Sequence, residues 1–188
     1  MKIYIRNMVS IRCKLIVKAE LEKLGMHCIA IELGEVEIKE DVSKEQYNRL
    51  NIALQRTGLE LLDDNKSIMV EKTRNLVVQM VHYSKELPKI NISDYISERL
   101  GYNYTYVSRL FSAVRGTSLS HYFIVQKIER AKELITYGEL TITEIAFKLH
   151  YSSVAHLSNQ FKKITGLTPS HFKRMKDKRK KRIPLGLV

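Results

Sequence analysis

The amino-acid sequence predicts two domains: a small α+β domain at the N-terminus, then an all-α domain in which a long helix joins two helix-turn-helix modules. Three observations lead to this prediction. In residues 1–63, stretches with apolar residues at a period of two alternate with stretches at helical spacing. Beyond them the spacing is helical throughout. Within this helical part, the segment Gly116-Thr-Ser-Leu-Ser-His-Tyr recurs 50 positions later as Gly166-Leu-Thr-Pro-Ser-His-Phe.

Residues 1–63 show the pattern strand, helix, strand, strand, helix, strand. Alternating apolar and polar residues predict the first strand, and apolar residues at helical spacing between Cys13 and Gly25 predict the first helix. Two period-two segments around a glycine turn predict a hairpin. Ser43 and Gln46 form a capping box that begins the second helix. The order βαββαβ is typical of a ferredoxin-like sandwich.

The loop Asn7-Met8-Val9-Ser10-Ile11-Arg12-Cys13, together with this element order, resembles the heavy-metal-associated domain of copper chaperones and transporting ATPases. That family carries Met-x-Cys-x-x-Cys here, because two thiolates at this spacing bind a soft cation such as Cu(I). Ser10 replaces the first cysteine. The resemblance therefore implies a degenerate domain that has lost its metal site, unless Met8 or a second copy completes it.

Two other interpretations of Cys13 stay open. A cysteine near the start of an amphipathic helix is commonly part of the core. Alternatively, the helix N-terminus and the neighbouring Arg12 favour the thiolate, which would make the thiol reactive.

Residues 64–88 are expected to form a linker helix. Apolar residues at helical spacing between Asn65 and Ser84 predict one continuous helix, which Pro88 breaks. Two roles remain open for this helix: a connector that packs on one of the domains, or a dimerisation surface.

The segment from Thr141 to Phe172 predicts a helix, a tight turn and a second helix. Thr141 and Glu144 form a capping box at its start. Ser152 or Ser153 is expected to cap the second helix, whose buried residues would be Leu157, Phe161 and Ile164, and which Gly166 ends. The segment is the second copy of a tandem module, because Val107 and Phe111 precede Leu157 and Phe161 by 50 positions. The helix from Leu119 to Tyr137, with Gly138 as its C-cap, joins the copies.

Residues 151–169, Tyr-Ser-Ser-Val-Ala-His-Leu-Ser-Asn-Gln-Phe-Lys-Lys-Ile-Thr-Gly-Leu-Thr-Pro, resemble the DNA-binding domain of the AraC/XylS family of bacterial transcription regulators. The resemblance covers residues 89–175. It implies sequence-specific binding to DNA and regulation of transcription. His150 departs from the family pattern, which has glycine in the second turn, although histidine tolerates a left-handed conformation better than most residues.

The outward residues of the second helix in each module are the candidate base-reading residues, and carrying over the family's positions selects the same set. Arg109 can pair with O6 and N7 of guanine, and Asn159 can pair with adenine. Backbone phosphates would be held by Ser153, Lys162 and Lys163. The complete base-reading set is Thr105, Tyr106, Ser108, Arg109, Ala155, His156 and Asn159. Two such helices could enter successive major grooves about 34 Å apart and recognise an asymmetric site.

The net charge of +12 is concentrated in the second half. Residues 1–80 carry 13 basic and 12 acidic side chains, whereas residues 81–188 carry 19 and 8. A basic half with helix-turn-helix modules is typical of a polyanion-binding protein. Residues 176–188 are expected to be a basic tail that attracts phosphates without sequence preference.

The sequence does not favour catalysis. Its six histidines show no metal-ligand spacing, and it contains no nucleotide-binding glycine motif and no acidic pair in a pocket-like setting. We therefore expect no enzyme activity, no catalytic residues, no cofactor and no bound metal. The chain has no apolar run of 18 residues and no leader sequence, so we expect a cytoplasmic protein without membrane contact.

Double-stranded DNA is the main partner expected. RNA polymerase is a further candidate, as is a second copy of the chain, bound through residues 65–84 or through the N-terminal domain. Two alternative functions stay open. The N-terminal domain could handle or sense a metal, or it could only dimerise or recruit partners for a DNA-binding protein.

Overall fold

The structure is a computed structural model that describes residues 1–84 and 91–180, with side chains up to residue 176. Contacts divide the chain into two compact units. The first unit contains residues 1–78 and 92–116, and the second contains residues 79–91 and 117–188. The units are described separately below. The boundaries predicted after residues 63, 88 and 175 rest on motifs and stay a prediction.

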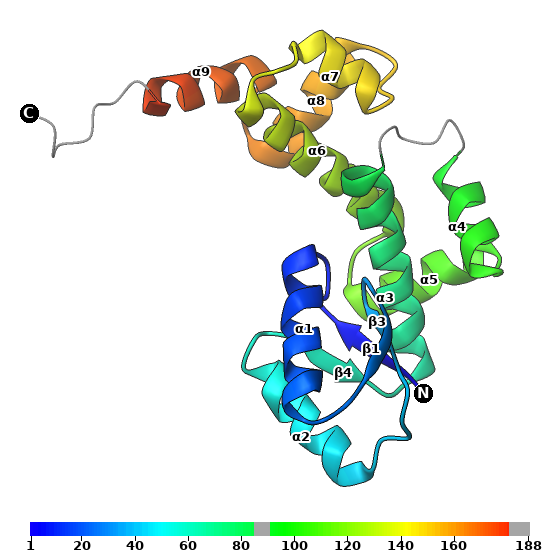
Figure 1. The fold of residues 1–188 in the computed structure, drawn as a ribbon. Helices are drawn as coiled ribbons and strands as arrows, with labels where there is room; N and C mark the ends of the chain where they lie inside the picture. The colour runs from blue at the N-terminus through cyan, green and yellow to red at the C-terminus, as the bar shows by residue number, and fades with distance from the viewer. Residues whose placement is uncertain (85–90, 181–188) are drawn as a thin grey trace, which may run out of the picture. The chain divides into compact units, whose positions relative to one another are not determined.

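The first unit begins with a four-stranded antiparallel sheet of order β2-β3-β1-β4. Its elements follow the predicted order of strand, helix, strand, strand, helix and strand (Figure 1). They are β1 (Lys2–Arg6), α1 (Ile11–Lys23), β2 (Cys28–Glu32), β3 (Glu35–Ile38), α2 (Lys44–Gln55) and β4 (Glu60–Leu62). This part of the chain is therefore α+β, as predicted, while its assignment to the ferredoxin-like class stays a prediction.

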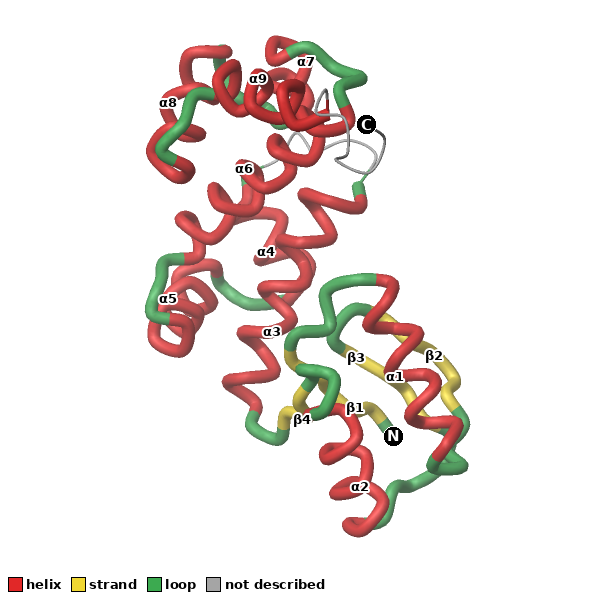
Figure 2. The backbone as a smooth tube through the Cα atoms, turned by 90° about the vertical axis from the view of Figure 1, so that its left-hand side faces the viewer, coloured by secondary structure: helices red, strands yellow, loops and turns green. Residues whose placement is uncertain are grey.

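Helices α1 and α2 cover one face of the sheet, and the core lies between them and the strands (Figure 2). The alternation of side chains along a strand places Ile3 and Ile5 of β1 in this core, where both are fully buried. Val17 of α1 and Leu54 of α2 pack against them from the helical layer. The predicted capping box of Ser43 and Gln46 is present at the start of α2, with both of its hydrogen bonds formed.

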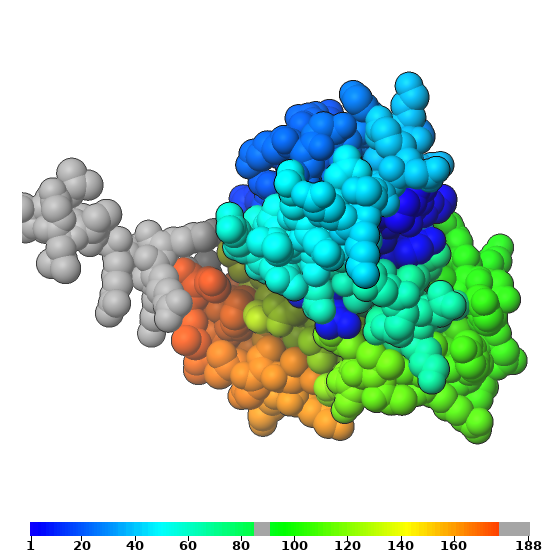
Figure 3. All heavy atoms as spheres, turned by 90° about the horizontal axis from the view of Figure 1, so that it is seen from below, coloured from blue at the N-terminus to red at the C-terminus, as the bar shows by residue number. Residues whose placement is uncertain are grey.

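Helix α3 (Asn65–Val78) follows the sheet and belongs to the same unit. It packs against β1 and also against α4 (Ile92–Leu100) and α5 (Tyr104–Arg115), the two helices of the first module. In the space-filling view, dark-blue atoms of β1 border the blue-green atoms of α3 (Figure 3). The α-helical part of the predicted linker helix ends at Val78, and residues 79–83 form a π-helical segment, η1 (Gln79–Tyr83). Pro88 lies outside the described residues.

The second unit packs α7 (Ile142–Lys148), α8 (Val154–Thr165) and α9 (Pro169–Lys180) around the long helix α6 (Leu119–Tyr137). Its core combines residues of α6 to α8 with the ring of Tyr151 in the turn. Segment η1 packs on α6, where His82 Nε2 lies 3.1 Å from Gln126 Oε1. The main buried residues are Leu119, Ile128, Ala131, Ile135, Ile145, Ala146, Leu149, Leu157 and Phe161.

Local signals fix the ends of these helices where the sequence predicted them. Thr141 and Glu144 form their capping box, and Ser153, the second of the two candidates, caps α8. Gly138 and Gly166 end α6 and α8 in the left-handed conformation. Helix α9 extends to residue 180, so the beginning of the predicted basic tail is helical, and residues 181–188 lie outside the described part.

None of the helices within residues 1–84 and 91–180 has the length and apolar character that crossing a bilayer requires.

Candidate nucleic-acid interface

The second helices of the two modules, α5 and α8, are built in the same way. Each begins at a capping side chain, Asn103 or Ser153, that accepts a hydrogen bond from the first turn. Each buries one residue of its second turn and one phenylalanine four positions later. A left-handed glycine ends each helix. This shared pattern leaves equivalent side chains exposed on the two helices.

The base-reading candidates of the first module lie on the outer side of α5. Thr105, Tyr106 and Arg109 are exposed, whereas Ser108 is partly buried, and its carbonyl oxygen accepts a hydrogen bond from Ser112. The exposed set can offer a guanidinium group, a phenol hydroxyl and a methyl-bearing hydroxyl to a partner. These are groups that recognise base edges and phosphates.

The candidates of the second module occupy the equivalent positions on α8. Ala155, His156 and Asn159 are all exposed, and so are Lys162 and Lys163. This helix therefore presents an imidazole, a carboxamide and two ammonium groups to solvent. Ser153, predicted to hold a phosphate, is exposed, and its hydroxyl oxygen accepts the backbone N–H of His156 at 3.0 Å. Its hydroxyl proton remains available for a second contact.

An aromatic residue of the turn contacts the reader candidate at the same repeat position in each module. In the first module, Tyr102 stacks on Tyr106 with ring centroids 5.8 Å apart. In the second, Tyr151 meets His156 edge to face at 5.2 Å. Tyr102 is 49% exposed and Tyr151 only 4% exposed, so the first module adds a second aromatic ring to its surface. Tyr102 is not among the candidates predicted from the sequence, because it precedes the N-cap Asn103 and so lies outside the helix in which residues four apart face each other.

His156 is held by a second contact. Its Nδ1 lies 3.0 Å from the hydroxyl oxygen of Ser152, four residues earlier. The ring is therefore oriented by Ser152 at one nitrogen and by Tyr151 at one side. Nε2 is the nitrogen left for a partner, and when Ser152 donates to Nδ1, Nε2 carries the proton and acts as a donor.

A buried lysine contacts the turn of the second module, and it is not among the residues predicted from the sequence. Lys127 of α6 is 9% exposed, and its Nζ lies 3.8 Å from the ring centroid of Tyr151 and 5.6 Å from that of Phe123. Within the described residues, burial is the cause found for a shift in the Lys127 pKa, with no contribution from an acidic partner. Burial lowers the pKa of Lys127 to about 8. The ammonium group thus packs on the Tyr151 ring, which in turn contacts His156.

The loop that carries Cys13 in the first unit shows hydrogen bonding rather than a ligand cluster. Burial raises the pKa of the Cys13 thiol, but hydrogen bonds from Ser10 and from the backbone outweigh it and leave the pKa lowered. Met8 is fully buried in the core, against which Cys13 also packs. Within the described residues there is no group of three or more side chains that could hold a metal.

Comparison with known proteins identifies the helical part. The family described as "Helix-turn-helix domain" matches residues 96–175. The solved C-terminal domain of AraT, a response regulator from Geobacillus stearothermophilus, is 26% identical with a TM-score of 0.50, over 66% of this chain and 94% of that chain. Residues 96–175 are therefore similar to a helix-turn-helix domain, in sequence and in fold. These matched residues include every base-reading and phosphate-binding candidate predicted from the sequence.

Two bacterial regulators are similar to more than half of this chain. An HTH-type transcriptional regulator of Staphylococcus aureus (strain MSSA476) is 30% identical over 111 residues, which are 58% of this chain and 14% of that protein. The HTH-type transcriptional regulator YtdP of Bacillus subtilis (strain 168) is 29% identical over 100 residues, 53% of this chain and 13% of its own length. The chain therefore spans only a small part of the length of these regulators.

Proposed function

We propose that this protein is a bacterial transcription regulator that binds double-stranded DNA sequence-specifically through its AraC-type domain. The observation that carries the proposal is the repeated surface of α5 and α8. At equivalent positions the two helices expose different hydrogen-bonding side chains above the same buried pattern. Two helices that recognise different base sequences require the same buried residues for folding but different exposed residues for base contacts.

The two helices would enter successive major grooves of B-DNA and recognise an asymmetric site. Recognition helices that read one face of the duplex lie about one helical turn, roughly 34 Å, apart. In the first module, Arg109 is assigned to a guanine and Thr105 to a thymine methyl group. In the second, Asn159 is assigned to an adenine, His156 to a base edge or a phosphate, and Lys162 and Lys163 to phosphates. The protein then acts by binding, without catalysis.

The electrostatic balance supports this function. Of the net charge of +12, residues 81–188 contribute +11, since they carry 19 basic and 8 acidic side chains. Basic side chains that neutralise phosphates release condensed counterions, which favours association with a polyanion. The +1 of residues 1–80 is too small to contribute a comparable attraction.

Selection of random DNA duplexes by the full-length protein tests the proposal. The expected result is a bipartite consensus whose two parts are about one helical turn apart. Arg109→Ala should relax the preference at one position of the first part and weaken binding to the consensus about tenfold, because a bidentate pair contributes about 1–3 kcal/mol of discrimination.

Arg115→Ala is the matched control. Arg115 is also an exposed arginine, in the last turn of the same helix and outside the base-reading set. It should leave the consensus unchanged. Flat enrichment by the wild-type protein, or equal loss of affinity for consensus and random DNA in Arg109→Ala, would contradict base reading.

A further inference from the structure

Helix α3 links the sheet to the first helix-turn-helix module within one compact unit. On one side it contacts β1, and on the other it packs against α4 and α5. The sequence predicted an apolar stripe on this segment, but three polar residues of the helix, Glu71, Thr73 and Asn75, are also buried. These buried polar groups require an explanation, because each costs free energy unless it is paired.

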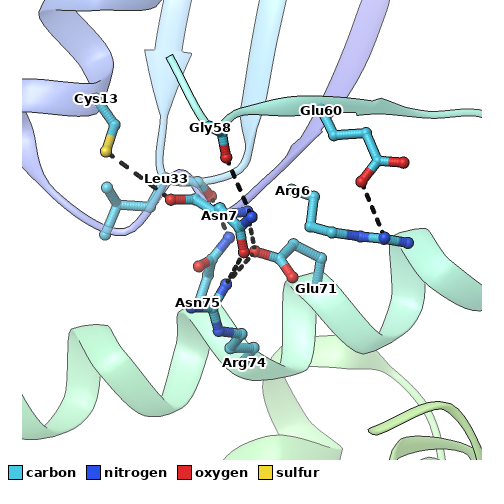
Figure 4. Close-up of polar contacts among 9 residues, drawn as sticks. All are labelled: Arg6, Asn7, Cys13, Leu33, Gly58, Glu60, Glu71, Arg74 and Asn75. Atoms are coloured by element: carbon cyan, nitrogen blue, oxygen red, sulfur yellow. Dashed lines mark hydrogen bonds and ion pairs between the residues drawn. The ribbon is translucent and has the colours of Figure 1, made fainter. Parts of the chain in front are cut away.

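Asn7, at the end of β1, is the centre of the first set of contacts (Figure 4). Its backbone N–H donates to Glu71 Oε1 at 2.9 Å, and its side-chain oxygen accepts from Arg74 at 3.3 Å. Arg74 also donates to Glu71 at 2.8 Å. On the side of the sheet, Asn7 donates to the carbonyl oxygen of Gly58 and accepts from the Cys13 thiol. The loop that follows β1 is thereby tied to α3.

The conformation of Asn7 belongs to this arrangement. Its φ of 67° lies in the left-handed region, which asparagine tolerates better than most residues other than glycine. In this conformation its backbone N–H points at the carboxylate of a helix 64 residues later in the chain.

The turn between β2 and β3 supplies a second point of attachment. Asn75 donates its side-chain N–H to the carbonyl oxygen of Leu33 at 3.1 Å. Gly34, next to it, has no room for a side chain, because a Cβ there would overlap the amide nitrogen of Asn75. Lys72 adds a third contact, since its Nζ lies 4.5 Å above the ring of Tyr4 and 3.7 Å from Glu35 Oε2.

These contacts fix both the position and the rotation of α3. Apolar surfaces can slide against one another at small cost, whereas buried hydrogen bonds require one geometry. The hydrogen-bonded attachment points lie on two separate loops of the sheet domain, and Lys72 adds a contact to strands β1 and β3. Residues 71–75 of α3 make all of these contacts. Since α5 packs on the same helix, a change in either loop would reach α5 through α3.

We propose that Glu71 and Asn75 are positioning residues, through which the sheet domain sets the placement and rigidity of α5, the first reader, while α8 is outside this control. The N-terminal domain would then regulate one half of the DNA site. Its effect on DNA rests on the proposed function, but the mechanical coupling does not.

Hydrogen exchange of the full-length protein without DNA tests the coupling by itself. In Glu71→Ala the Asn7 N–H loses its acceptor and Arg74 loses one of its acceptors. Amides of residues 7–10, α3 and α5 should therefore exchange about tenfold faster, a typical size for coupling between sites. Amides of α8 should keep their wild-type rates. Glu45→Ala is the matched control. It also removes a carboxylate that pairs with an arginine, but Glu45 and its partner Arg49 both lie on the exposed surface of α2.

DNA binding provides the second readout. On duplexes in which only one half of the consensus is intact, Glu71→Ala should lose affinity for the half read by α5 and keep its affinity for the half read by α8. Asn7→Gly keeps the left-handed backbone and removes the contacts to Gly58 and Arg74, so it should show the same pattern if Glu71→Ala does not fold.

Two results would overturn the inference: exchange that rises in the sheet domain while α5 keeps its wild-type rates, or exchange that rises equally in α5 and α8. The second would indicate a general loss of stability. If the wild-type protein binds no consensus at all, the proposed function fails, while the exchange experiment still decides the coupling.

Discussion

At the scale of single residues, the turn of the second module depends on a histidine in a conformation that favours glycine. His150 has a φ of 50°, and Gly101, at the equivalent position of the first module, has a φ of 70°. His150, which stands where the family pattern has glycine, therefore keeps the left-handed backbone conformation of this turn. This conformation destabilises the folded state, because a left-handed residue other than glycine raises its free energy by roughly 1–2 kcal/mol.

We expect His150→Gly to raise the free energy of unfolding by about 0.5–1 kcal/mol, because relief of backbone strain exceeds the entropy that glycine loses on folding. Urea unfolding without DNA measures the change. Gly101→Ala is the reciprocal control. An added Cβ there meets no atom within 4 Å, so its expected loss of about 1 kcal/mol would come from the backbone alone. An unchanged or lower stability of His150→Gly would show that the turn is not strained.

At the scale of elements, the buried Lys127 connects the long helix α6 with the turn before α8. Its ammonium group lies over the Tyr151 ring, which contacts His156 on the other element. The cation–π contact stabilises the charge, while burial opposes it and lowers the pKa to about 8. Because the unfolded pKa is about 10.4, the folded state binds its proton less tightly than the unfolded chain.

Lys127→Met should therefore stabilise the protein by about 1–2 kcal/mol near pH 7, because it removes the cost of burying a charge and keeps an apolar stem of similar length. The penalty in the wild type is complete below pH 8 and disappears as the pH rises past the unfolded pKa. The difference between variant and wild type should thus shrink between pH 8 and pH 10 in urea unfolding. Lys148→Met, at an exposed position of α7, should show no such pH dependence. Destabilisation by Lys127→Met at pH 7 would mean that the cation–π contact outweighs burial.

At the scale of the whole molecule, we expect phosphate binding and base reading to be carried by different residues of the proposed DNA-binding domain. Lysines at the end of α8 follow the base-reading candidates of its first turns, and they are exposed. Phosphate contacts set the affinity and its salt dependence, whereas contacts to bases set the preference for a sequence. The two contributions should therefore separate by mutation.

Replacing both Lys162 and Lys163 by alanine should reduce the slope of log affinity against log salt by about 2, because each lost phosphate contact removes about one released counterion. Affinity for all sequences should fall together. Asn159→Ala is the control: it should lose the preference at one base pair and keep the wild-type slope. Titrations at several salt concentrations with consensus and random duplexes measure both quantities. A double variant with an unchanged slope would remove these lysines from the phosphate-binding set.

The sequence by itself determined the elements and their repetition. Capping boxes at Ser43 and Thr141, the left-handed glycines at Gly138 and Gly166, and the spacing of apolar residues act within a few positions of the chain. Such signals are local, so they can be recognised without knowledge of the fold. The same holds for the exposed reader candidates, because a helix with one buried stripe leaves its other faces to solvent.

Only the tertiary structure decided which polar residues are buried. The burial of Glu71, Asn75 and Lys127, and the different exposure of Tyr102 and Tyr151, depend on partners far away in the sequence. A charged residue in a helix is ordinarily placed in solvent, and no local pattern reveals that a loop or an aromatic ring will cover it. The sheet's attachment to α3 is of this kind, since its hydrogen bonds join residues 42 to 67 positions apart.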